Sequence, residues 1–442
     1  MIVNVIQLGF ILLPVAALAG QMLVNESAFI ANADGSAPAG WTTWSARAET
    51  APRCYVDALH WRGKPGSLAV NGASNTAAHG GWRREVPGVE PGAWYRFTAY
   101  YRTDGVEHES LQVLARVDWN EATGKRAGKP DYVYKARREG EWTKLTTEAP
   151  APAKASAAVL ELFLSNSPQG TVWWDDISFE RIDAPAPRPV IIATVNLRPQ
   201  STKSAAASVK RFIETIEKSA PAKTDVILLP EGITVIGTGK QYVDVAETIP
   251  GPTTITLGEV AKKRNTYIVA GIYEREAHVV YNTSVLIDRN GKVAGKYRKV
   301  YLPSGEVEGG LTPGNSYPVF ETDFGTVGMM ICYDVFFPDP ARALVNRGAE
   351  IVLMPIWGGD LTLGKARAIE NRVFLATSGY DYPTQVMDPD GEVLALAAKD
   401  GEVAVTTIDL NKRQWQQLLG DMRARRAKEY RVDVPVPVPG LN

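Results

Sequence analysis

A proline-rich segment divides this chain into two stretches whose hydrophobic patterns belong to different fold classes. Residues 183–189 contain three prolines and form a stiff, extended linker, which marks a domain boundary. Before the linker, short runs of alternating polarity indicate strands. After it, apolar runs of strand length alternate with amphipathic runs of helical length. With 442 residues, the chain is long enough for two or three domains, each with its own core.

Residues 25–182 predict an antiparallel β-sandwich. Polarity alternates along residues 94–102, 111–117 and 158–164, and nine of the eleven tryptophans fall in this region. Most aromatic side chains of a sandwich fill its core, so core packing is favoured over sugar stacking for these tryptophans. Residues 172–179, with paired acids at Asp175 and Asp176, resemble the closing strand of jelly-roll carbohydrate-binding modules. This resemblance implies a jelly-roll-like module with a glycan as its ligand.

The N-terminus has the pattern of an export signal. Residues 1–25 contain no charge, and an apolar run over residues 8–19 closes on Ala17-Leu18-Ala19, an Ala-x-Ala cleavage pattern. We therefore predict a signal peptide over residues 1–19 and a secreted or periplasmic protein. Because the positive n-region is missing, an uncleaved N-terminal membrane anchor is the alternative. Residues 431–442, which alternate valine and proline, predict an extended C-terminal tail.

Residues 190–430 predict a layered α/β domain in which strands alternate with helices and hairpins are inserted. An Asn-Gly pair at Asn290 and Gly291 predicts one hairpin turn, and residues 388–391 predict another. Strands are expected over residues 190–197, 225–231, 266–271, 281–288, 292–300, 325–331, 351–355 and 374–378, and helices over residues 205–219, 254–264, 340–347 and 365–372.

Composition excludes several classes of function. The formal net charge of -1 gives no electrostatic case for nucleic-acid binding. The four histidines show no paired ligand spacing and there is no Cys-x-x-Cys, so no metal site is predicted. We also predict no cofactor. The chain contains no Gly-x-Ser-x-Gly elbow, which removes the common serine hydrolase interpretation.

Cys332 stands at the end of an apolar strand, on a corner that leads into a helix. An attacking cysteine needs a base, and no histidine is suitably placed. Glu231 follows a run of aliphatic residues at the carboxyl end of a strand, where burial raises the proton affinity of a carboxylate. Taken singly, Cys332 can be a core residue, Glu231 a solvated strand-end acid and Lys299 a surface charge.

Three motifs together resemble the nitrilase superfamily of carbon-nitrogen hydrolases, in order and approximate spacing, over residues 190–430. The resemblance implies a four-layer α-β-β-α sandwich as the fold of the catalytic domain. The motifs are Leu229-Pro230-Glu231, Tyr297-Arg298-Lys299 with Leu302-Pro303, and Cys332-Tyr333-Asp334; Arg367-Ala368 with Glu370-Asn371 is similar to the family's helix after the nucleophile.

The same resemblance implies the site. Cys332 would be the nucleophile and Glu231 the general base, while Lys299 and the backbone N–H of Tyr333 would bind the oxyanion. Amidases of the family use a second glutamate. Glu308 is favoured for that catalytic role because it lies shortly before a Pro-Gly pair, and Glu306 is the other candidate, expected to contact substrate. Trp357 would line the acyl pocket.

The leading hypothesis is an exported hydrolase that cleaves a linear, non-peptide amide through a Cys332 thioester. Nitrile hydrolysis by the same triad is one alternative, although Cys332-Tyr333-Asp334 is similar to the amidase branches rather than to the Cys-Trp-Glu of true nitrilases. A non-catalytic glycan- or surface-binding protein with a degenerate scaffold is the other. The resemblance also implies a homodimer formed through the helix after the nucleophile.

Overall fold

The structure is a computed structural model that describes residues 20–32, 37–431 and 433–434. The described chain forms two compact units. One contains the residues up to Pro185 together with those from Trp415 onward, and the other spans Ala186–Gln414. The α/β domain therefore ends at Gln414 rather than at the expected residue 430. The predicted signal peptide and most of the predicted tail lie outside the described residues.

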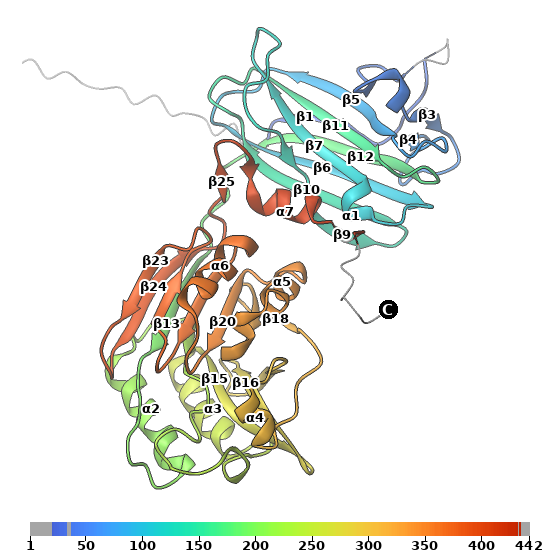
Figure 1. Ribbon diagram of the computed structural model, residues 1–442. Helices are drawn as coiled ribbons and strands as arrows, with labels where there is room; N and C mark the ends of the chain where they lie inside the picture. Colours follow the sequence, from blue (N-terminus) through green and yellow to red (C-terminus); the bar gives the residue numbers. More distant parts are fainter. Residues whose placement is uncertain (1–19, 33–36, 432, 435–442) are drawn as a thin grey trace, which may run out of the picture. The chain divides into compact units, whose positions relative to one another are not determined.

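The first unit is built from two antiparallel sheets (Figure 1). The prediction of a β-sandwich is confirmed in part, because the unit also contains two short helices that were not predicted. The seven-stranded sheet has the order β3 (Arg53–Asp57), β4 (Ser67–Asn71), β12 (Thr171–Ile182), β6 (Trp94–Asp104), β10 (Trp142–Pro150) and β9 (Lys135–Glu139), with β1 (Met22–Glu26) also paired to β12; the five-stranded sheet has the order β2 (Thr42–Ser45), β5 (His79–Pro87), β11 (Ala157–Ser165), β7 (Val113–Asn120) and β8 (Asp131–Tyr132).

Both helices lie at one part of this unit. Helix α7 (Met422–Glu429) packs on α1 (Glu109–Gln112) and on strand β8, and the small hairpin of β25 (Trp415–Gln416) and β26 (Gly420–Asp421) precedes it. The guanidinium of Arg425 lies 5.9 Å from the centre of the Tyr132 ring. The stem of Lys428 is buried in this contact, and burial lowers the pKa of its ammonium to about 8. The chain thus returns to its first unit after completing the second.

The tryptophans of the first unit mainly fill its interior, as the sequence favoured. Trp82, Trp119 and Trp174 are at most 2% exposed and belong to the core between the sheets. The indole N–H of Trp119 donates to Asp131 at 2.9 Å, and that of Trp82 donates to the carbonyl of Ala69 at 3.0 Å. Burying a large ring while satisfying its N–H stabilises the core, as at Trp82 and Trp119, whereas the buried N–H of Trp174 has no hydrogen-bond partner.

The second unit contains two six-stranded sheets. Both predicted hairpins are present, since β16 pairs with β17 and β22 pairs with β23. One sheet has the order β17 (Val293–Arg298), β16 (Val279–Ile287), β15 (Tyr267–Glu276), β14 (Val226–Leu228), β13 (Pro189–Val195) and β24 (Val403–Asp409); the other has β18 (Val319–Glu321), β19 (Thr326–Met329), β20 (Ile351–Pro355), β21 (Phe374–Ser378), β22 (Thr384–Met387) and β23 (Val393–Ala397).

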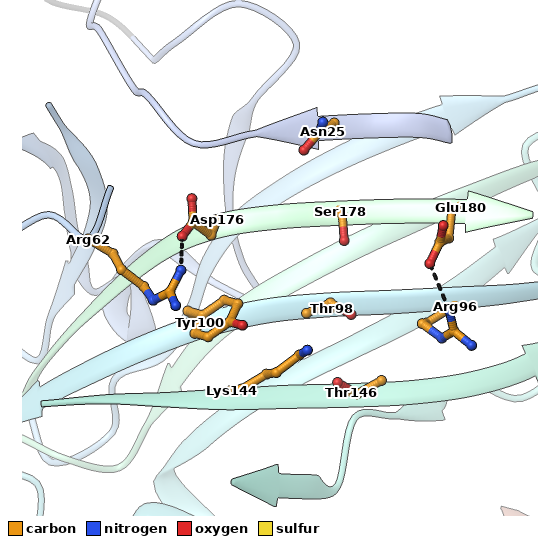
Figure 2. Close-up of a pocket in the computed structure, with 10 residues that line it drawn as sticks. All are labelled: Asn25, Arg62, Arg96, Thr98, Tyr100, Lys144, Thr146, Asp176, Ser178 and Glu180. Atoms are coloured by element: carbon orange, nitrogen blue, oxygen red, sulfur yellow. Dashed lines mark hydrogen bonds and ion pairs between the residues drawn. The ribbon is translucent and has the colours of Figure 1, made fainter. Parts of the chain in front are cut away.

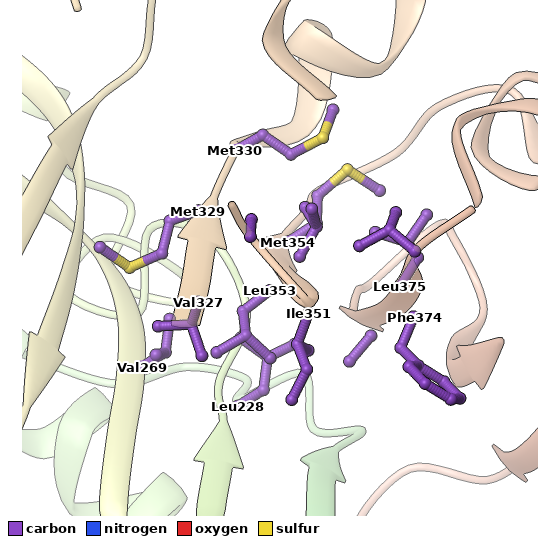
Figure 3. Close-up of a cluster of buried hydrophobic side chains, with 14 of the residues drawn as sticks. Leu228, Val269, Val327, Met329, Met330, Ile351, Leu353, Met354, Phe374 and Leu375 are labelled. Carbon is purple, nitrogen blue, oxygen red and sulfur yellow. The ribbon is translucent and has the colours of Figure 1, made fainter. Parts of the chain in front are cut away.

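The two sheets pack face to face, and helices cover their outer faces (Figure 1). Helices α2 (Ala205–Ser219) and α3 (Pro252–Arg264) pack on the first sheet, and α5 (Asp339–Asn346) and α6 (Leu361–Asn371) pack on the second. Figure 3 shows the interior, where Leu228 and Val269 of one sheet lie close to Val327 and Leu353 of the other. Strands covered on both faces must be apolar throughout, which explains why they read as continuous hydrophobic runs. No helix in the described part of the chain is long and apolar enough to cross a membrane.

Candidate active site

Three chain segments that end at the same edge of the packed sheets bring the predicted site residues together. Glu231 follows strand β14, Lys299 follows β17, and Cys332 follows β19. Glu231 can approach strand β15 because residue 271 is glycine. A Cβ at Gly271 would lie 2.6 Å from the Cα of Glu231. The sequence therefore predicted correctly which positions meet, although each is separated from the next by more than thirty residues.

Lys299 is the centre of the cluster. Its side chain is 1% exposed, and its Nζ lies 2.9 Å from Oε1 of Glu231 and 3.0 Å from Oε1 of Glu306. Burial alone would lower the pKa of Lys299, but the neighbouring carboxylates of Glu231 and Glu306 outweigh burial and raise it. Lys299 is therefore a cation in a buried position, where a charge interacts strongly with its neighbours.

The second glutamate of the site is Glu306, and not Glu308 as the sequence favoured. Both lie on the short helix α4 (Ser304–Glu308). Residues two apart on a helix point in directions about 200° apart, so only one of them can face the site. Glu306 is buried against Lys299, whereas Glu308 is exposed. Burial and the charge of Glu231 raise the pKa of Glu306.

Asn282 is a member of the cluster that the sequence analysis missed. It lies on β16 and is fully buried, and its Nδ2 donates to Oε1 of Glu231 and to Oε1 of Glu306, both at 2.7 Å. Its backbone carbonyl accepts the N–H of Lys299 at 2.9 Å. The sequence signal was a run of three polar residues, Asn282, Thr283 and Ser284, between apolar residues of one strand. Asn282 holds both carboxylates in fixed positions around the lysine.

Cys332 occupies a tight corner between β19 and the 3-10 turn η3 (Cys332–Phe336). Its φ of +44° lies in the left-handed region, a strain of roughly 1–3 kcal/mol that the surrounding structure must hold. Asp334, fully buried, supplies that support. Its carboxylate accepts the Tyr297 hydroxyl at 2.7 Å and the N–H groups of Ile331 and Tyr301 at 2.8 and 3.0 Å. Burial raises the pKa of Asp334 to about 6.

The thiol of Cys332 is protonated in the resting site. Its Sγ lies 3.3 Å from the carbonyl oxygen of Gly358. Burial, followed by the negative charge of Glu231, raises the pKa of the thiol to about 12, while Lys299 acts in the opposite direction. A thiol with so high a pKa attacks only if a base removes its proton. Glu231, whose charge acts on the thiol and whose buried Oε2 has no hydrogen-bond partner, is a candidate for that step.

Aromatic side chains line the space around the cluster. Trp357, at the end of β20, packs edge-on against Tyr380 with ring centres 4.9 Å apart. Tyr242 and Tyr273 stack with ring centres 4.8 Å apart. Burial raises the pKa of each phenol, and the nearby charges of Glu231 and Glu306 raise it further. The half-buried ring of Tyr333 packs on Phe336 and Phe337. Trp357, which was predicted to line the acyl pocket, thus lies on the segment that contacts the thiol. Of these tyrosines, only Tyr333 was predicted.

The comparison with known families agrees with this geometry. The family model described as Carbon-nitrogen hydrolase matches residues 191–417, just over half of the chain. The chain belongs to the carbon-nitrogen hydrolase family. It is therefore an enzyme that acts on carbon-nitrogen bonds, and the prediction of such an enzyme is confirmed.

Relatives within the family carry both amidase and nitrilase names. The human protein named Omega-amidase NIT2 is 31% identical over 275 residues, covering 56% of this chain and 98% of its own. A protein named Nitrilase from Pyrococcus abyssi is 32% identical over 266 residues, covering 54% of this chain and 98% of its own.

Solved structures give the same picture of similarity. Saccharomyces cerevisiae Nit3, a member of branch 10 of the nitrilase superfamily, aligns with 57% of this chain and 96% of its own at 23% identity and a TM-score of 0.44. An amidase from Nesterenkonia sp. aligns with 52% of this chain and 95% of its own at 22% identity and a TM-score of 0.43. The family match begins at residue 191, so the part of the first unit that precedes the linker lies outside it.

Proposed function

We propose that this carbon-nitrogen hydrolase cleaves a linear, non-peptide amide through a thioester on Cys332, with Glu231 as the general base. The observation that supports the proposal is the buried ammonium of Lys299. It forms ion pairs with Glu231 and Glu306, and its charge lowers the pKa of the Cys332 thiol against the effect of burial. A buried charge of this kind is retained at a cost in desolvation, and such groups concentrate where chemistry needs them.

In the first half of the reaction, Glu231 takes the proton of the Cys332 thiol as Sγ attacks the amide carbonyl carbon. The carbonyl oxygen becomes an oxyanion, which the ammonium of Lys299 and the backbone N–H of Tyr333 stabilise. Glu231 then passes its proton to the nitrogen as the C–N bond breaks. Ammonia or an amine leaves, and the acyl group remains on sulfur as a thioester.

In the second half, one water molecule is consumed. Glu231, again a carboxylate, removes a proton from the water as its oxygen attacks the thioester carbon. The same two donors stabilise the second oxyanion, and the C–S bond then breaks. The proton on Glu231 returns to the sulfur, so the free acid leaves and the thiol is restored.

Glu306 is proposed to position rather than to transfer protons. Glu306 and Glu231 both accept hydrogen bonds from Asn282 and Lys299, so Glu306 helps to hold the ammonium in place for the oxyanion. Burial and the charge of the neighbouring Glu231 carboxylate raise the pKa of Glu306.

Hydrolysis of an amide is expected to exceed that of the nitrile with the same acyl group by at least about tenfold in kcat/KM. The physical reason is that amide cleavage requires one group to carry one proton to the leaving amine, and Glu231 can do this. Ammonia release from an amide and its matched nitrile, measured with the purified full chain, tests this. Faster turnover of the nitrile would replace the amidase assignment with nitrile hydrolysis by the same triad.

A second proposed function is glycan binding by the first unit. A groove of about 500 Å³ lies on the face of the seven-stranded sheet and is lined by side chains of β1, β6, β10, β12 and a loop (Figure 2). Hydroxyls of Thr98, Thr146 and Ser178 alternate there with charged groups. Stacking on an aromatic ring is not available in this groove, since the guanidinium of Arg62 covers the Tyr100 ring at 3.8 Å. Sugar binding would therefore depend on hydrogen bonds.

Lys144 is the natural test of this groove. Its ammonium lies 5.8 Å from the centre of the Tyr100 ring and projects among the hydroxyls (Figure 2). Lys144→Ala is expected to weaken binding of the full chain to its best glycan on an array by about tenfold, the usual loss for a charged hydrogen bond. Lys154→Ala, an exposed lysine outside the groove, is the matched control. No glycan binding by the wild type would leave the sheet face without this role.

Export and dimerisation complete the proposal. The apolar N-terminal run supports a cleaved signal peptide, with a membrane anchor as the alternative, and the N-terminal residue of the protein recovered from cells distinguishes them.

Leu361 and Ile369 on α6 are exposed and apolar, which supports a homodimer formed through the helices after the nucleophile. The mass of the purified protein in light scattering tests the dimer.

A further inference from the structure

Tyr380 carries a buried polar atom that neither the fold nor the proposed reaction uses. It follows strand β21, and its N–H donates to the carbonyl oxygen of Trp357 at 3.3 Å. Its hydroxyl oxygen is shielded from solvent and has no hydrogen-bond partner. Leaving a buried hydroxyl unpaired is unfavourable, so a hydrogen-bond partner supplied by a ligand would recover that cost.

The Tyr380 side chain lies next to the segment that contacts the Cys332 thiol. The ring packs against Trp357, and the next residue along the chain, Gly358, accepts from the Cys332 thiol. Burial, together with the negative charge of Glu231, raises the pKa of Tyr380 well above its usual value, so the phenol is neutral and close to the general base. A neutral phenol donates one hydrogen bond and accepts others.

The charged groups around Tyr380 cancel each other. The guanidinium of Arg198 lies 5.4 Å from the centre of the Tyr380 ring and forms an ion pair with Asp381 at 2.6 Å. The N–H of Asp381 donates to Trp357 at 2.8 Å, which fixes the pair on this wall. Because Asp381 pairs with Arg198 and the negative charge of Glu231 also acts on Tyr380, an anionic ligand group gains little attraction here. A neutral polar group needs no such attraction.

We propose that Tyr380 is a specificity-determining residue whose hydroxyl donates a hydrogen bond to a neutral acceptor on the acyl chain of the substrate. The preferred substrates are then linear amides with a carbonyl or hydroxyl oxygen along the acyl chain, ahead of plain aliphatic amides and of amides that end in a carboxylate. This inference rests on the proposed amidase function and names the substrate class of that same site. A site built to pair a buried polar group rejects analogues that lack the partner.

Three primary amides with the same main-chain length separate the possibilities. They are pentanamide, N-acetylglycinamide and glutaramic acid, whose acyl chains are respectively apolar, neutral with an acceptor, and anionic. For the wild type, kcat/KM is expected to be about tenfold higher with N-acetylglycinamide than with either of the others, the factor that one hydrogen bond provides. Tyr380→Phe, which removes only the hydroxyl oxygen, is expected to reduce that preference to less than about threefold.

Tyr382→Phe is the matched control. Tyr382 lies two residues away, and its hydroxyl is also buried without a hydrogen-bond partner. It faces helix α6 instead of the site, since a Cβ at Gly364 would lie 1.9 Å from its oxygen. Burial and the charge of Asp360 raise the pKa of Tyr382. The order of the three amides is therefore expected to be the same in Tyr382→Phe as in the wild type.

Two results would overturn the inference. One is a wild type that prefers glutaramic acid, which would mean that Arg198 recognises an anion. The other is a Tyr380→Phe variant that lowers kcat/KM equally for all three amides, which would mean a structural role. If turnover is too slow to compare, the three amides are ranked as protectants of Cys332 against iodoacetamide, a binding readout. Failure of the amidase function itself is distinct, because it appears as no hydrolysis of any amide by the wild type.

Discussion

Cys332→Ala is expected to lower amide hydrolysis by about 10⁴-fold or more, because no other group in the site can form the thioester. The substitution keeps the Cβ, so the left-handed backbone at residue 332 is strained no more than before. It removes the contact between Sγ and the carbonyl of Gly358, worth about 1 kcal/mol or less. The fold should survive, and the loss of activity should be a loss of chemistry.

The measurement compares kcat/KM for an amide with the thermal midpoint of the same sample. Cys54→Ala is the matched control, since Cys54 is the other cysteine, is half-buried and belongs to the first unit. Burial raises the pKa of Cys54 to about 12, as it does for Cys332, but Cys54 has no carboxylate positioned to take its proton. Hydrolysis that persisted in Cys332→Ala with an unchanged midpoint would eliminate the thioester mechanism.

Glu231→Gln is expected to reduce kcat by about 10³-fold, within the range of a lost general base. Glutamine has the same shape, and its carbonyl oxygen can still accept from Lys299 and Asn282. What disappears is the negative charge and the ability to take a proton, so both acylation and thioester hydrolysis slow down. The variant is therefore informative about chemistry and leaves packing almost unchanged.

The neighbouring glutamates provide a graded comparison. Glu306→Gln is expected to cost about 10- to 100-fold, because a residue that positions others contributes less than one that transfers protons. Glu308→Gln is expected to stay within about twofold of the wild type, since its side chain is exposed and away from Lys299. Steady-state rates of the three variants on one amide give the ranking. A larger effect at Glu308 than at Glu306 would contradict the arrangement of helix α4 described above.

The elements of the fold were largely readable from local pattern. Helix α2 begins and ends where the amphipathic run does, and its N-cap Ser204 accepts from the N–H of Ala207 at 3.2 Å. The hairpin between β16 and β17 turns at Asn290 and Gly291, and Gly291 has the positive φ of +81° that the turn requires. Each of these features depends on residues that are close together in the sequence, which is why the sequence was enough to predict them.

Long-range packing was not readable in the same way. Residues 415–430 were assigned to the α/β domain, yet α7 packs on strand β8, nearly three hundred residues earlier. A polar helix with several arginines has no strong pattern of its own, so its place is set by the surface that receives it. Helix α7 was missed for this reason.

The sequence by itself determined the identity of the acid, the amine and the thiol, because each stands in a recognisable local motif at the end of a strand. Only the tertiary structure decided the rest of the site. It selected Glu306 over Glu308 through the direction of one helical turn, and it revealed Asn282 as the donor that ties both carboxylates together. It also left the Tyr380 hydroxyl without a partner beside the general base. The physical reason is that side-chain direction and burial depend on neighbours from distant segments, which no local pattern contains.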